Sequence, residues 1–155
     1  MPKIRKAERP IRSSPSASKG AKPNLTKANY EALAEFRFAL RTFLAFSESA
    51  AKEGGLTAQQ HQALLTIKGT PNADTVSIRL LSERLLINHN TAVELVDRLV
   101  EGGLVMRTRD ADDRRRAQLE LTAGAERLLR SLSAAHLKEL KAVRPALLNL
   151  LVQLK

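Results

Sequence analysis

The chain has 155 residues, 43% of them hydrophobic, a net charge of +10 and no cysteine. This size suits one domain with a modest core, and the lack of cysteine excludes disulfides and thiol redox chemistry within the chain. The basic excess favours a polyanionic partner such as DNA, RNA or an anionic surface. No stretch is apolar for long enough to span a bilayer and no apolar signal segment begins the chain, so we expect a cytoplasmic protein with no membrane partner.

Residues 1–24 predict a disordered basic arm. They hold seven basic residues and one glutamate, with several serines and prolines and little apolar surface to bury. Two interpretations stay open for this arm. It touches DNA phosphates without sequence preference, or it is simply a solvated tail.

A long helix is predicted from about Thr26 to Lys52, because apolar residues recur along it at helical spacing and a glycine pair follows. All five aromatic residues of the chain fall within it. We favour packing in the core or between subunits for these rings. The alternative is that Phe36, Phe43 and Phe46 help to line a pocket for an aromatic or amphipathic ligand.

Three shorter helices follow. Thr57 opens a capping box, which predicts a helix from Ala58 to Gly69. A loop over residues 70–75 separates it from a helix capped by Ser77, and Asn88 caps the next one.

The helix after Asn88 is amphipathic and ends at a second glycine pair. Its apolar residues repeat at helical spacing and predict one buried stripe of Ala92, Leu95, Val96, Leu99 and Val100. The opposite face carries Asn90, Thr91, Glu94, Asp97, Arg98 and Glu101.

A charged hairpin follows the four helices. Residues 104–107 and 116–121 alternate with the period of a strand, and residues 110–115 join them. Two helices and then a charged hairpin describe a winged helix. The expected fold class is therefore mainly α with a small β-wing, a winged helix-turn-helix.

Two helices are expected at the end of the chain. Thr122 caps a fifth helix, and Pro145 falls in the first turn of a sixth, which is apolar on nearly every side and needs burial. Burial between two subunits is favoured, and burial in the chain's own core is the alternative. We thus expect a helical dimerisation region over residues 25–56 and 123–155, flanking a winged-helix DNA-binding domain over residues 57–122.

Base contacts are expected from the start of the fourth helix, because the N-terminal part of a recognition helix meets the bases. The candidates are His89, Asn90, Thr91 and Glu94, whose side chains suit adenine, the thymine methyl group and the cytosine amino group. For Glu94 we prefer an ion pair with Arg98, one turn further on. Arg98 suits a phosphate, and the caps Ser77 and Asn88 complete this part of the expected interface.

Arginines of the hairpin are the second group of DNA-binding candidates, since arginine at a hairpin tip can enter a narrow minor groove. Nearby aspartates, among them Asp113, can hold these side chains in position. The candidate arginines are Arg107, Arg109, Arg114, Arg115 and Arg116.

The segments LTAQQHQALL and LLSERLLINHNTAVELVDRLVEGGLVMRTRDADDRRRAQLELTAGAERLL resemble the MarR family of bacterial transcriptional regulators. The resemblance implies a homodimer that binds a pseudo-palindromic operator in double-stranded DNA through the helix over residues 88–101. It places the wing motif Asp-x-Arg on Asp113 and Arg115. The chain departs from the usual family pattern at residues 88–90, often Ser-Pro-Ser, and at Glu94, which leaves the operator sequence open.

The resemblance also implies a ligand, because family members often bind small aromatic or lipophilic compounds that weaken DNA binding. Candidate ligand contacts are Phe36, Phe43, Phe46 and His61. The chain has no phosphate-cradling glycine motif, no GxSxG and no cysteine nucleophile, and its three histidines lack the spacing of metal ligands. We expect no cofactor, no metal and no enzymatic activity.

The expected function is a sequence-specific transcriptional regulator, a homodimeric repressor relieved by a small ligand. Two alternatives stay open. A non-specific architectural DNA-binding protein would show steep salt dependence and little sequence preference. A winged-helix protein-interaction module would fit the acidic residues of the fourth helix.

Overall fold

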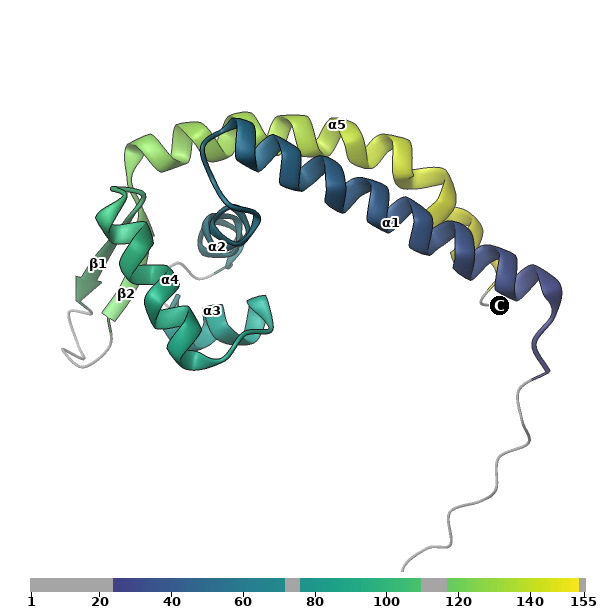
Figure 1. Cartoon of the computed structure of the whole chain (residues 1–155), viewed down its shortest axis with the longest axis horizontal. Coiled ribbons are helices and arrows are strands. Elements are labelled where there is room, and N and C mark those ends of the chain that lie inside the picture. Colours follow the sequence, from purple (N-terminus) through teal and green to yellow (C-terminus); the bar gives the residue numbers. More distant parts are fainter. Residues whose placement is uncertain (1–23, 72–75, 110–116, 154–155) are drawn as a thin grey trace, which may run out of the picture.

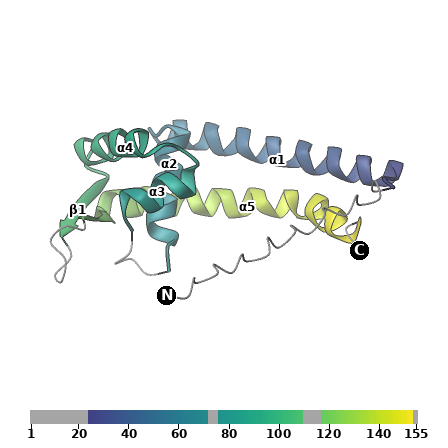
Figure 2. The ribbon, with the colours of Figure 1, turned by 90° about the horizontal axis from the view of Figure 1, so that it is seen from below.

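The computed structural model describes residues 24–71, 76–109 and 117–153. Its elements are α1 (Lys27–Glu53), α2 (Ala58–Gly69), α3 (Ile78–Leu85), α4 (His89–Glu101), β1 (Val105–Arg109), β2 (Ala117–Leu121) and α5 (Ala123–Gln153). The long helices α1 and α5 run antiparallel and side by side, while the short helices and the strands gather at one end of this pair (Figure 1, Figure 2). The predicted fold class, mainly helical with a two-stranded wing stem, is confirmed.

Helix starts follow the capping residues. Thr26 and Thr57 each form a full capping box, in which the threonine side chain and the third helical residue bond each other's backbone amides. Ser77 and Asn88 cap α3 and α4 by accepting from the amides of Leu80 and Thr91. Local side-chain chemistry therefore sets where these four helices begin.

The hydrophobic core lies between the short helices, the two strands and the first half of α5. The stripe predicted on α4 is buried at Ala92, Leu95, Val96 and Leu99, and it packs with residues of α2, α3, α5 and the strands, including Leu64, Leu81, Leu119 and Leu129. Leu119 of β2 also donates its amide to the carbonyl of Val76, at 3.0 Å, which ties the sheet to the segment before α3. Side-chain packing and this bond fix the wing stem on the helices.

The two strands pair antiparallel, with Val105 opposite Leu121 and Arg107 opposite Leu119. Val105 and Leu119 are buried, whereas Met106 is exposed. Because side chains alternate across a strand, Arg107 lies on the same face as Val105, the face that packs on the core.

The prediction of a separate sixth helix was wrong. α5 continues from Ala123 to Gln153 with Pro145 inside it, and Figure 1 shows it bending near its C-terminal end. Proline removes one backbone hydrogen bond and commonly kinks a helix, yet packing along a neighbour can hold both sides together. Here α1 is that neighbour.

Both long helices leave large apolar side chains in solvent. The exposed residues are Tyr30, Leu33, Phe38, Leu40 and Leu44 on α1, and Leu137, Leu140, Leu147, Leu148, Leu151 and Val152 on α5. None of the described helices has the length and apolar character needed to cross a membrane.

Candidate nucleic-acid interface

The first turn of α4 presents polar groups at the surface. His89, Asn90 and Glu94 are exposed, and Thr91 is partly buried. The Asn88 side-chain oxygen accepts from the Thr91 amide at 2.8 Å and so caps α4. The side-chain NH2 group of Asn88 takes no part in this cap. The residues expected to meet bases therefore share one accessible helix end.

The expected ion pair between Glu94 and Arg98 is not formed. Arg98 Nε donates instead to the backbone carbonyl of Glu94, at 3.2 Å, and among the described residues the Glu94 carboxylate has no cationic partner. Spacing of four residues brings two side chains within reach but does not choose between a carboxylate and a carbonyl as acceptor. The Glu94 carboxylate is thereby left exposed on α4.

A different ion pair links α4 to the sheet. The Arg107 guanidinium on β1 donates to the Asp97 carboxylate, with Nη2 and Oδ1 2.5 Å apart. The sequence pattern predicts Asp97 on the outer face of α4 and Arg107 among the DNA contacts, but it does not predict that the two side chains meet. Nothing in the local spacing signals a contact across the turn between a helix and a strand.

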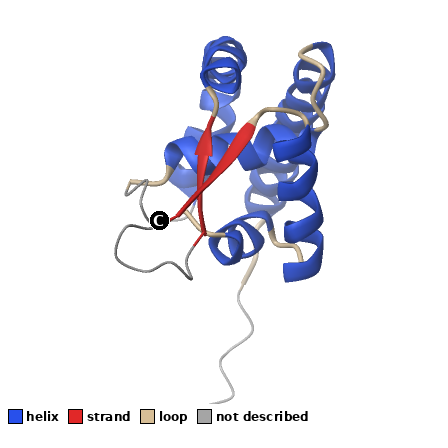
Figure 3. Ribbon diagram, turned by 90° about the vertical axis from the view of Figure 1, so that its left-hand side faces the viewer, coloured by secondary structure: helices blue, strands red, loops and turns tan. Residues whose placement is uncertain are grey.

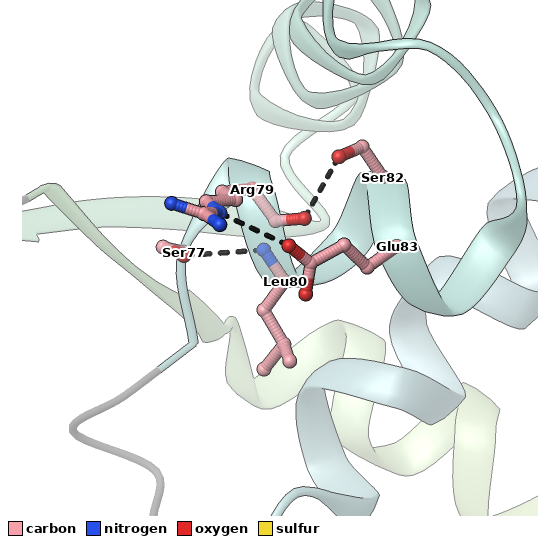
Figure 4. Close-up of polar contacts among 5 residues, drawn as sticks. All are labelled: Ser77, Arg79, Leu80, Ser82 and Glu83. Carbon is pink, nitrogen blue, oxygen red and sulfur yellow. Dashed lines mark hydrogen bonds and ion pairs between the residues drawn. The ribbon is translucent and has the colours of Figure 1, made fainter. Parts of the chain in front are cut away.

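The start of α3 lies beside the wing stem and exposes one arginine that sequence analysis missed. Ser77 accepts from the Leu80 amide at 3.2 Å, and Arg79 Nε donates to Glu83 at 3.0 Å, as Figure 4 shows. The Arg79 side chain is 84% exposed. The available signal was its position, since an exposed arginine in the first turn of the helix before a recognition helix can reach a phosphate.

Several predicted wing residues lie outside the described part of the chain. Asp113, Arg114, Arg115 and Arg116 belong to that group, as does most of the N-terminal arm, and for Arg109 only the backbone in β1 is described. Their roles stay predictions from the sequence.

Figure 3 looks onto the end of the molecule where the two strands lie among the helices. The start of α3, the polar face of α4 and the wing stem belong to this end, away from the C-terminal turns of α5 (Figure 1). Cations and carboxylates alternate over it, with Arg79, Arg98 and Arg107 near Glu83, Glu94 and Asp97. Such a surface offers hydrogen-bonding groups of both kinds rather than uniform positive charge.

A second cluster lies where α1, α2 and α5 meet. The rings of His61 and His136 are 4.6 Å apart between centroids and tilted by 33°, and Phe43 and Phe46 meet the His136 ring edge-on at 5.9 and 5.5 Å. Three of the four predicted ligand contacts are thus brought together around His136. Phe36, partly buried on α1, is not among the ring contacts of the described residues.

Hydrogen bonding distinguishes the two histidines. His136 Nδ1 donates to the Leu132 carbonyl at 2.6 Å, and its Nε2 lies 2.7 Å from the Ser47 hydroxyl. His61 is 3% exposed, and neither of its ring nitrogens has a partner among the described residues. Burial, and after it the neighbouring His136, lowers the pKa of His61, so its neutral form is favoured.

His61 and His136 are 75 residues apart in the chain, so their spacing gives no sign that the two rings meet. Only the packing of α2 against α5 brings them together. Within the described ranges, no group of three or more histidine, cysteine or acidic residues could hold a metal ion.

Comparison with known proteins supports the resemblance that the sequence predicted. A sequence model of the MarR family matches residues 54–116. A multiple antibiotic-resistance repressor (MarR) from Listeria monocytogenes is 27% identical, with a TM-score of 0.58 over 77% of this chain and 79% of that one. The search among curated proteins found no match.

Two further solved structures share the fold at lower identity. CouR from Rhodococcus jostii, bound to p-coumaroyl-CoA, is 23% identical, with a TM-score of 0.61 over 74% of this chain and 79% of that one. A MepR mutant from S. aureus, bound to an oligodeoxyribonucleotide, is 19% identical, with a TM-score of 0.61 over 81% of this chain and 98% of that one.

Proposed function

We propose that the chain is a DNA-binding transcription regulator that acts as a homodimeric repressor, in keeping with the match of residues 54–116 to the MarR family model. One observation carries the proposal: the exposed polar start of α4 lies at the same end of the molecule as the wing stem and the start of α3. A recognition helix needs this arrangement to enter a major groove while its neighbours hold the backbone.

Roles follow from position. His89, Asn90 and Thr91 contact base edges, and the side-chain amide of Asn90 suits adenine. Glu94, which lacks a cation among the described residues, accepts from a cytosine amino group. Phosphates are held by Arg98 and Arg79 and by the N-terminal ends of α3 and α4, at Ser77 and Asn88.

The wing completes the interface. Arg115 enters the minor groove, with Asp113 steering it, and the neighbouring arginines Arg109, Arg114 and Arg116 supply positive charge next to the phosphates. The arm over residues 1–24 adds contacts without sequence preference. These roles rest on the sequence and on the position of the stem from which the hairpin extends.

Dimerisation would cover the exposed apolar rows of α1 and α5. A second copy of the chain offers the same rows, as an interface with twofold symmetry requires. Two recognition helices then reach successive major grooves, with half-sites about one helical turn apart. A dimer placed on a promoter represses by occlusion.

Selection of bound sequences from a random DNA pool, at physiological salt, tests this function. We expect enrichment of an inverted repeat. Binding without enrichment would replace the proposal with the architectural alternative, and absence of binding would leave the protein-interaction module.

The wing role has its own test on the selected duplex. Arg115→Ala should weaken binding about tenfold, equivalent to about 1.4 kcal/mol, and should make the affinity less dependent on salt. Lys138→Ala, which removes an exposed positive charge from α5 away from its apolar row, is the matched control and should change neither. Unchanged affinity of a folded Arg115→Ala protein would remove the wing from the mechanism.

Relief by a small ligand is a second part of the proposal. It is supported by the buried His61 ring beside the aromatic cluster, which has no hydrogen-bond partner among the described residues. It is also supported by CouR, which is solved bound to p-coumaroyl-CoA. A ligand bound between α1, α2 and α5 acts only if it prefers the DNA-free arrangement. A panel of aromatic acids should include one that lowers DNA affinity in the wild type but not in Phe43→Ala. If none does, and Phe43→Ala changes only stability, this part fails.

A further inference from the structure

We propose that Asp97 and Arg107 form a positioning pair that fixes the wing against the recognition helix, and that the Arg107 guanidinium does not itself contact DNA. The inference rests on the proposed function, since it assigns a role within the same interface. It replaces the phosphate or groove contact that the sequence suggested for Arg107.

The contact adds a polar link between α4 and β1, which also pack on each other through buried residues such as Leu99 and Val105. Arg107 Nη2 and Asp97 Oδ1 are 2.5 Å apart, a short charge-assisted hydrogen bond. The two side chains keep 40% and 47% of their surface exposed. Such a half-exposed pair contributes little to folding stability, so its main effect is on the direction in which the wing stem leaves α4.

The pair lies at one end of a line of contacts that crosses the sheet. Arg107 of β1 stands opposite Leu119 of β2, and the Leu119 amide donates to the Val76 carbonyl at 3.0 Å. Val76 directly precedes Ser77, the cap of α3. These contacts therefore run from α4 through both strands to the start of α3. They connect the recognition helix, the wing stem and the cap of α3.

Charge gives the pair a second effect. Asp97 lies on α4 between two other acids, Glu94 and Glu101, on the side of the helix that would approach the phosphates. An unpaired carboxylate there would repel DNA, and Arg107 neutralises it. A guanidinium committed to this carboxylate is correspondingly unavailable to a phosphate.

A double-mutant cycle separates positioning from direct contact. Arg107→Ala, Asp97→Ala and the double variant are titrated with the selected duplex at several salt concentrations. A positioning pair predicts that each single variant binds about three- to tenfold more weakly and that the double variant is no weaker than Arg107→Ala, because contacting residues do not add. The salt slope should stay that of the wild type in all three.

Direct contact predicts a different pattern. Arg107→Ala would then lower the salt slope by about 0.9, the value for one lost phosphate contact, and Asp97→Ala would bind as tightly as the wild type or more tightly. Either result, or losses that simply add in the double variant, overturns the inference while leaving the proposed function intact. A wild type that shows no sequence preference overturns both.

Matched controls come from Lys27 and Glu31, an exposed ion pair at the start of α1. Lys27→Ala, Glu31→Ala and their double variant change the net charge in the same way, far from the wing, and should leave affinity and salt slope unchanged. As a second route to the same answer, the Asp97→Asn, Arg107→Gln double variant keeps a neutral hydrogen-bonding pair. Its affinity should lie closer to the wild type than that of either alanine variant.

Discussion

Leucine side chains are buried in the winged-helix part but often exposed along the pair of long helices. In the winged-helix part, Leu64, Leu81 and Leu99 are fully buried by neighbouring elements of the same chain. Along α1 and α5 many leucines stay in solvent although the two helices pack on each other. The winged-helix part has a closed core, whereas the long helices keep an apolar surface that the described residues do not cover.

This contrast indicates that the two regions have different roles. The winged helix needs a fixed shape in order to hold a recognition surface, and a closed core supplies it. An apolar surface left open along two helices instead offers area for association, since contiguous exposed apolar patches on soluble proteins mark interaction sites. Four substitutions test this difference between the two regions.

Leu81→Ala should have the largest effect. Its side chain is fully buried between helices, and removing it leaves a cavity that costs about 2 to 5 kcal/mol. Urea unfolding at a fixed protein concentration measures the loss. Leu65→Ala is the matched control, because Leu65 lies on α2 but is 47% exposed. Equal losses at the two positions would contradict the closed core.

Leu151→Glu tests the open surface. Leu151 is 60% exposed near the end of α5, so a charge there should leave the folded chain intact but weaken dimerisation at least about tenfold, since a carboxylate would be buried without a partner. Sedimentation velocity over a concentration series gives the dissociation constant. Leu65→Glu places the same charge on the winged helix and should leave the dissociation constant unchanged. If Leu151→Glu also leaves it unchanged, the dimer does not form through this surface.

The buried His61 links the two regions and should make stability depend on pH. Its lowered pKa in the folded state means that the unfolded chain binds a proton more readily, so stability should fall as the pH drops below the ordinary value of 6.5. His61→Phe should lessen this fall, as thermal unfolding between pH 5 and pH 8 would measure. His89→Phe, at an exposed position, should retain it. An unaltered pH profile in His61→Phe would show that other groups cause the dependence.

The smallest effect is expected at Leu86, between α3 and α4. This residue has a left-handed backbone, with φ 55° and ψ 40°, and its side chain is 92% exposed. A non-glycine residue pays about 1 kcal/mol for that conformation, and little burial would be lost, so Leu86→Gly should stabilise the protein by up to about 1 kcal/mol. Leu86→Ala keeps the strained backbone and should bring no gain.

Local signals predicted most of the fold. The caps at Thr57, Ser77 and Asn88 and the apolar stripe of α4 depend on residues within a few positions of one another. The three caps are confirmed, and so is the stripe, although its last residue, Val100, is only partly buried. Pro145 was misjudged because the missing hydrogen bond is a local penalty, whereas the packing along α1 that sustains the helix is not local.

Tertiary contacts account for what the sequence left hidden in the candidate site. His61 meets His136, and Asp97 meets Arg107, only after the helices and the sheet have assembled. Arg98 had two acceptors within reach on the same residue, and spacing alone did not choose between them. The residue types were visible in the sequence, but their partners were not.

We propose that the open surface of α1 and α5 joins two winged helices on one DNA site. The most direct test is the stoichiometry of the complex with the selected duplex, measured by sedimentation equilibrium. We expect two chains per duplex for the wild type and a loss of the complex in Leu151→Glu. A single chain bound to the duplex, with an affinity that Leu151→Glu leaves unchanged, would contradict this proposal.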